Sequence, residues 1–139
     1  MPYILWKLDD APIVVVSITG WLDAVAHFEL SRDVANLIAG LPGKIYRIND
    51  LSGAHIHLVD LVNVLAQVSK GWAGTASDPR IVTYMVMHQP NFLLGRASSI
   101  RSWHWARQAR ICANMQEALA LARAECGQPQ PVTPDGLRV

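Results

Sequence analysis

The sequence contains only two cysteines, Cys112 and Cys126, and no excess of either charge. The predicted helix between the two thiols rises roughly 18 Å, whereas a disulfide needs Cα atoms within about 7 Å. We therefore expect two free thiols. Twelve basic and eleven acidic residues give a formal net charge of +1. The basic excess that is typical of nucleic-acid binders is missing, so nucleic acid is disfavoured as a partner.

Long apolar runs are missing as well. The longest, from Ile13 to Leu22, is interrupted by polar residues and has about half the length of a membrane-spanning helix. The opening MPYILWKLDD lacks the basic stretch and apolar core of a signal peptide. We therefore expect a cytoplasmic protein with no membrane partner. The nucleophile elbow, the P-loop and the dinucleotide-binding glycine pattern do not occur, so we expect no cofactor and no catalytic activity.

What remains is the pattern of a single α/β domain of 139 residues, half of them apolar. Alternation predicts a strand over Tyr3–Leu8, and β-branched residues predict a central strand over Ile13–Thr19. These two strands form an antiparallel hairpin. Further strands are expected over Lys44–Asn49, Arg80–His88 and Arg110–Cys112. Helices are expected over Asp23–Ala39, Leu58–Lys70 and Asn91–Arg107, and after Asn114.

The order β-β-α-β-α-β-α-β-α predicts a mixed, mostly parallel sheet with an N-terminal antiparallel hairpin. The domain spans residues 1–126, and the proline- and glycine-rich residues 127–139 predict a flexible C-terminal tail. Asp23 is expected to cap the first helix, and Asn114 with Glu117 forms a capping-box pattern. The inner stripe predicted for the second helix consists of Leu58, Leu61, Val62, Leu65 and Val68.

The most polar stretch, NDLSGAHIHLVD over residues 49–60, follows a predicted buried strand and reads as a loop over 50–57. Ligands of open α/β sheets gather outside the carboxyl ends of the strands. If strands 44–49 and 80–88 are parallel neighbours, their loops converge there. We therefore expect one partner- or ligand-binding surface made of Asp50, Ser52, His55, His57, Asp60, His88, Gln89 and Asn91.

Two interpretations of this surface remain open. A polar loop on a rigid scaffold can bind another protein without special geometry. Alternatively, His55, His57 and His88 could wall a crevice for a small molecule, or for a metal whose bound water acts as a hydrolytic nucleophile. The H-x-H spacing does not by itself specify a metal, so we assign no metal ligands.

The segment GRASSIRSWHWARQAR over residues 95–110 contains four arginines and no acidic residue. Trp103 and Trp105 are roughly 200° apart around a helix, so both cannot face the same core. Trp105 either packs on its own chain or anchors an interface, where Trp and Arg are enriched. We expect a homodimer through this helix, with Arg101 and Trp105 in the interface.

With these elements in place, the chain resembles the STAS domain of anti-sigma-factor antagonists, and within that group small SpoIIAA-like bacterial proteins. The resemblance rests on the element order, on IND-LSG over residues 48–53 and on the closing helix NMQEALALA over residues 114–122. It implies a STAS-like fold and a non-catalytic regulatory module that binds another protein. The antagonists carry a phosphorylatable Ser or Thr at the start of the helix after that strand. Here residues 53–68 contain neither, and Ser52 lies too early.

Overall fold

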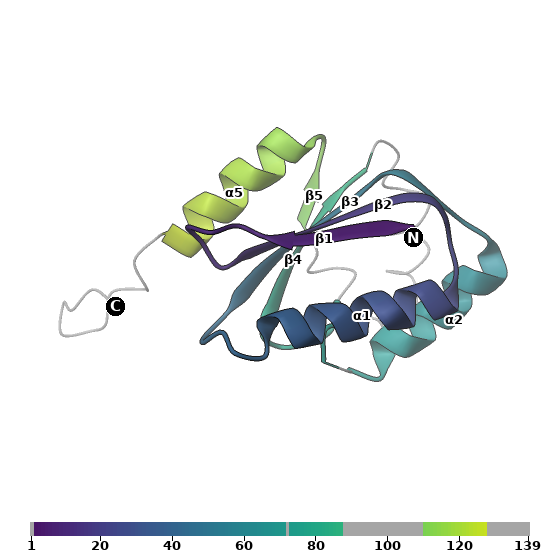
Figure 1. Ribbon diagram of the computed structural model, residues 1–139. Helices are drawn as coiled ribbons and strands as arrows, with labels where there is room; N and C mark the ends of the chain where they lie inside the picture. Colours follow the sequence, from purple (N-terminus) through teal and green to yellow (C-terminus); the bar gives the residue numbers. More distant parts are fainter. Residues whose placement is uncertain (1, 72, 88–109, 128–139) are drawn as a thin grey trace.

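The computed structural model describes residues 2–71, 73–87 and 110–127 (Figure 1). Within these residues the strands and helices follow the predicted order. The strands are β1 (Tyr3–Lys7), β2 (Ile13–Leu22), β3 (Ile45–Ile56), β4 (Ile81–Val86) and β5 (Arg110–Cys112). The helices are α1 (Ala24–Ile38), α2 (Leu58–Ser69) and α5 (Met115–Gly127). The predicted helix over 91–107 and the predicted tail beyond Gly127 lie outside the described residues.

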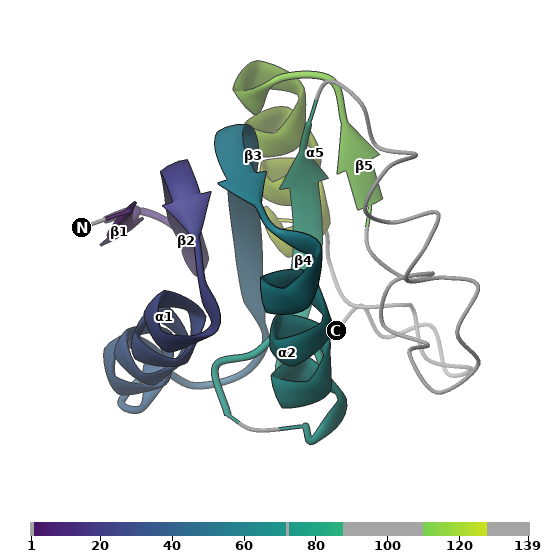
Figure 2. The same ribbon diagram turned by 90° about the vertical axis from the view of Figure 1, so that its right-hand side faces the viewer.

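The strands form one sheet in the order β1-β2-β3-β4-β5. β1 and β2 pair as an antiparallel hairpin, with Tyr3 opposite Ile18, whereas every other neighbouring pair is parallel. The mixed, mostly parallel sheet with an N-terminal hairpin is therefore confirmed. Figure 1 shows the layers: α1 and α2 cover one face of the sheet, and α5 covers the other. The view in Figure 2 shows α1 and α2 side by side beneath the strands.

Each face of the sheet has its own apolar core, and β2 contributes to both. Val14 and Val16 pack with Leu30 and Val34 of α1, while Ile13 and Val15 face the side that α5 covers. Successive side chains of a strand point to opposite faces, so a strand covered on both sides needs a continuous apolar run. The run of β-branched residues at the start of β2 is explained by this position in the middle layer.

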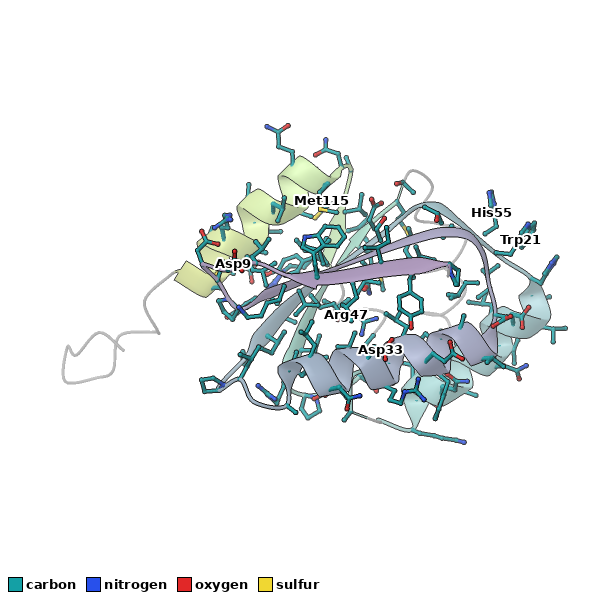
Figure 3. All side chains as sticks on the ribbon, in the orientation of Figure 1. Asp9, Trp21, Asp33, Arg47, His55 and Met115 are labelled. Atoms are coloured by element: carbon teal, nitrogen blue, oxygen red, sulfur yellow. The ribbon has the colours of Figure 1, made fainter. Side chains whose placement is uncertain are left out.

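The core under α1 also contains a charge. Arg47 of β3 is 3% exposed, and its side chain lies between the sheet and the helices (Figure 3). Its Nε donates a hydrogen bond to Asn49 Oδ1 at 2.7 Å, and its Nη1 donates to Gly74 O at 2.6 Å. Desolvation lowers the pKa of Arg47 to about 10, which the nearby Asp78 partly offsets, so the guanidinium stays charged at neutral pH. Gly74 N in turn donates to Asp78 Oδ2. The guanidinium thus fixes the Gly74–Asp78 turn against the sheet.

The sequence predicted two of the strand ends wrongly. β2 continues to Leu22 instead of ending at Thr19, and β3 continues to Ile56 instead of ending at Asn49. The expected loop over 50–57 is therefore mostly strand. Each extension supplies the other's backbone partner, because Thr19–Leu22 pair in parallel with Gly53–Ile56. Glycine and polar residues in both segments favoured loops, but the hydrogen bonds between the two strands override that local preference.

The helix termini agree with the capping patterns. Asp23 Oδ1 accepts a hydrogen bond from Ala26 N at 2.7 Å, and Asn114 Oδ1 accepts from Glu117 N at 2.8 Å. Glu117 reaches back to Ala113 N rather than to the amide of Asn114. At the other end of α1, three carbonyl groups, those of Ile38, Leu41 and Gly43, accept hydrogen bonds from the Arg80 guanidinium. Both cysteines are free thiols, as expected.

Gly74→Ala tests the close approach of the Gly74–Asp78 turn to α1. Gly74 has a φ of 81°, and a Cβ there would lie 2.1 Å from the carbonyl oxygen of Ser31, so the backbone would have to move. We expect the free energy of unfolding, measured by urea denaturation, to fall by about 2–4 kcal/mol. Gly71→Ala is the matched control.

Gly71 also has a positive φ, 70°, but nothing lies within 4 Å of its added Cβ. This control should cost only the left-handed conformation, about 1–2 kcal/mol. Equal losses in the two variants would show that contact with Ser31 contributes nothing.

Candidate functional site

The carboxyl end of the sheet is uneven, because β3 continues past the end of β4. The β3–β4 pairing runs from Ile45–Ile81 to Asp50–Val86. Beyond Asp50, β3 pairs with the last residues of β2, from Thr19–Gly53 to Leu22–Ile56. We call this two-stranded parallel extension, residues 19–22 and 53–56, the end ribbon. It carries the starts of α1 and α2, which follow directly on its two strands.

A bulge separates the end ribbon from the rest of the sheet. Ser17 pairs with Asp50 and Thr19 pairs with Gly53, so β3 has one more residue than β2 between these pairs. Asp50 stabilises this irregularity, since its Oδ1 accepts hydrogen bonds from Ser52 N at 3.1 Å and from Ser52 Oγ at 2.6 Å. Bulges change the direction in which the following side chains point. Asp50 and Ser52 therefore have a structural role in this bulge.

The two histidines of the H-x-H pair contact one tryptophan. Trp21 lies opposite His55 in the end ribbon, and their ring centroids are 5.2 Å apart. His57 stacks on Trp21 with centroids 4.1 Å apart and ring planes 9° apart. All three side chains are exposed, and Figure 3 shows Trp21 and His55 together at the end of the molecule opposite Asp9. The arrangement is an exposed aromatic cluster.

α2 carries apolar side chains on its outer surface as well as on its inner one. Its buried residues are Leu61, Val64, Leu65 and Val68. Leu58 and Val62, which the sequence analysis placed on the inner stripe, are exposed, so that part of the prediction was wrong. The end ribbon carries the first turn of α2 beyond the last paired residue of β4.

Exposed apolar side chains occur on the end ribbon and on the first two turns of the helices that follow it. We call them the end patch: Trp21, Val25, Leu58, Val59 and Val62. Their exposed fractions lie between 52% and 72%. Sequence reasoning missed Trp21, Val25 and Val59. The signal that could have found Val59 is the composition of α2, where apolar residues occupy more than half of the helix circumference and not one narrow stripe.

The start of α2 contains a charge and no hydroxyl. Asp60 lies in its first turn, where the helix dipole favours a carboxylate. His57 occupies the N-cap position, but its side chain makes no capping hydrogen bond. This turn therefore lacks a hydroxyl group, in agreement with the absence of Ser and Thr from residues 53–68.

The described residues bring together only part of the surface that the sequence predicts. Asp50 lies level with the end of β4, whereas His55 lies roughly 16 Å farther along β3, at about 3.3 Å per residue. Asp60 lies near the histidines, since it follows His57 by three residues. His88, Gln89 and Asn91 lie outside the described residues, as do Arg101 and Trp105 of the expected dimer interface.

No three potential metal ligands gather anywhere in residues 2–71, 73–87 and 110–127. Within the same part of the chain, no helix has the length and apolar character needed to cross a membrane.

One hydrogen-bonded pair joins the two helices that support the end patch. Gln67 of α2 donates from Nε2 to Ala24 O of α1 at 3.0 Å, which leaves its Oε1 to accept from His27 Nδ1 at 2.7 Å. His27 is buried, and desolvation lowers its pKa below the ordinary value, with the Gln67 hydrogen bond opposing that shift. The neutral imidazole is therefore the form that the folded protein favours.

Comparison with solved structures identifies the architecture. An uncharacterised protein of the DUF3478 family with a SpoIIAA-like fold, from Shewanella loihica PV-4, superposes with a TM-score of 0.55. It is 12% identical, and the match covers 86% of this chain and 91% of that one. The fold is STAS-like. An anti-sigma factor antagonist from Mycobacterium paratuberculosis, 18% identical, matches with a TM-score of 0.51 over 87% of this chain and 92% of its own. No protein-family model and no curated protein sequence matches the chain.

The pKa of His27 leads to a prediction about pH. Because its folded-state pKa lies below the unfolded value of 6.5, its contribution to stability is complete above that pH. The contribution is lost as pH falls below 6.5 towards the folded-state pKa. His27→Gln, which keeps a hydrogen-bonding side chain but does not titrate, should reduce the fall in unfolding free energy between about pH 7 and pH 5. Chemical denaturation at a series of pH values measures this. Identical pH profiles for the two proteins would contradict the assignment.

Proposed function

We propose that this protein is a non-catalytic regulatory module that binds another protein through the end patch and its polar border. The observation that carries the proposal is the exposure of the end patch. Five large apolar side chains, each more than half exposed, occur on the end ribbon and on the first turns of α1 and α2, elements that are otherwise well packed. Contiguous exposed apolar surface on a globular protein typically marks an interaction site.

The polar residues of the sequence analysis lie around this patch in two groups. His55 and His57 contact Trp21 directly, and Asp60 belongs to the same turn of α2 as Leu58 and Val59. Asp50 and Ser52 lie lower on β3, at the bulge. We propose that the first group takes part in partner binding, together with His88, Gln89 and Asn91, which follow β4. The second group orients the end ribbon.

A likeness to an anti-sigma factor antagonist supports a regulatory role, and the residues of this chain alter the expected control. The first turn of α2 contains no hydroxyl group that a kinase could modify. Binding at the end patch is therefore not switched by phosphorylation of a serine or threonine in that turn.

Two further parts of the proposal concern location and assembly. The free thiols Cys112 and Cys126 agree with the reducing environment of the cytoplasm. Homodimerisation through Arg101 and Trp105 remains a prediction, which size measurements of the Trp105→Ala variant can test. The metal-assisted hydrolase alternative needs a third ligand besides His55 and His57, and the candidate His88 lies outside the described residues.

Capture of partners from the native organism tests the proposal. The wild-type chain should recover a protein that Val59→Gln does not, because that substitution replaces an exposed apolar side chain of the end patch by a polar one. Recovery should fall at least about tenfold, the loss that removal of a central interface contact of about 1.4 kcal/mol produces. Quantitative mass spectrometry of cross-linked complexes provides the measurement.

The matched control is Leu121→Gln, an exposed apolar position on α5, on the other side of the sheet. It should recover the same protein as the wild type. A partner whose recovery is equal for all three chains would show that it binds elsewhere and would contradict the proposed surface.

A further inference from the structure

Among the described residues, the end ribbon and the starts of α1 and α2 carry carboxylates and no Lys or Arg. Two carboxylates adjoin the end patch, Asp23 before α1 and Asp60 in the first turn of α2, whereas Asp50 lies lower on β3, at the bulge. The basic residues of the described elements lie elsewhere. They are Lys7, Arg32, Lys44, Arg47, Lys70, Arg80, Arg110 and Arg123. Within the part of the chain that the structure describes, the border of the end patch therefore carries two carboxylates and no Lys or Arg side chain.

The three carboxylates have hydrogen-bonding capacity left for a partner. Asp23 uses Oδ1 for its N-cap bond to Ala26 N, and Asp50 uses Oδ1 for both bonds from Ser52. Their salt bridges would have to come from a partner, since the ion pairs within the described residues involve other carboxylates, those of Asp10, Asp33 and Glu125. A cationic partner would supply the missing charge.

The shape of the apolar surface indicates which secondary structure fits it. On α2, the exposed residues Leu58, Val62 and Ala66 recur every fourth position and form a row along about 12 Å of the helix. Rows with this spacing are the ridges that pack into the grooves of a second helix. Trp21, next to the row through His57, supplies an aromatic contact of the kind that anchors interface centres.

We propose that the end patch binds an amphipathic helix of a partner protein whose apolar face is bordered by Lys and Arg side chains. This inference rests on the proposed function and adds the chemistry of the partner. Apolar contact with Trp21, Leu58, Val59 and Val62 supplies the affinity. The Asp23 and Asp60 carboxylates contribute chiefly to partner choice and association rate, because surface ion pairs are individually weak. Phosphate-rich surfaces, whether nucleic acid or anionic lipid, meet repulsion at Asp23 and Asp60.

Two synthetic helices test this chemistry on the full-length chain. Both have 18 residues with leucine at i, i+3, i+4 and i+7, and they differ only in carrying lysine or glutamate at the remaining positions. In fluorescence anisotropy with labelled peptides, the Leu–Lys helix should bind at least about tenfold more tightly than the Leu–Glu helix. Circular dichroism should show that the Leu–Lys peptide gains helix on binding.

Substitutions locate the binding on the molecule. Val62→Gln should weaken the Leu–Lys complex about tenfold, whereas Leu121→Gln on α5 should leave it unchanged. Asp60→Asn should weaken binding about threefold and reduce its dependence on salt. Asp9→Asn, at the opposite end of the molecule (Figure 3), should do neither. Thermal melts of each variant control for folding.

Failure of this inference differs from failure of the proposed function. If the native partner requires the end patch but neither peptide binds, the basic-helix inference is wrong and the regulatory surface stands. Equal binding of the two peptides, or equal effects of Val62→Gln and Leu121→Gln, also overturns the inference. If the Leu–Lys helix binds as described while no native partner depends on Val59, the surface chemistry stands and the proposed function fails.

Discussion

The structure of the candidate site depends on one backbone pairing, that of Thr19–Leu22 with Gly53–Ile56. Without it, β3 would end level with β4, and α2 would start directly above the sheet. With it, α2 begins several residues farther out, and its first turns extend past the layer that would otherwise cover them. Asp50 stabilises the bulge at which this extension starts. Leu58 and Val59 are exposed in the first turn of this helix, and Val62 is exposed on its outer face.

The exposed apolar side chains do not compromise the rest of the domain, which is well packed. Two complete cores lie on the two faces of the sheet, and Arg47, fully surrounded, links β3 to the Gly74–Asp78 turn. The His27–Gln67 contact joins the start of α1 to the last turn of α2. The elements that carry the end patch are thus packed and hydrogen-bonded, and a partner that binds them need not order them first. Pre-ordered surfaces lose less conformational entropy on binding than flexible ones.

The sequence predicts the layers of this fold better than it predicts the candidate site. Continuous β-branched residues identify β2 and β4, and capping residues place the starts of α1 and α5, because these signals are local. The end ribbon is a non-local structure: glycine and polar residues in 50–56 favour a loop until a second strand supplies hydrogen bonds. The error at Leu58 and Val62 has the same origin, since periodicity shows that a residue is apolar but not whether a neighbouring element covers it. The alternation of His55 and His57 with Ala54 and Ile56 was the one available sign of a strand.

Hydrogen exchange followed by NMR tests the central claim most directly, because it reports backbone pairing residue by residue. If β3 continues to Ile56, the amides of Ala54–Ile56 that face β2 should exchange orders of magnitude more slowly than those of an unstructured chain. Asp50→Ala should then accelerate exchange there more than in the Tyr46–Asn49 part of β3. Exchange of Ala54–Ile56 at the rate of an unstructured loop would show that the end ribbon does not exist, and with it the exposed start of α2 would lose its explanation.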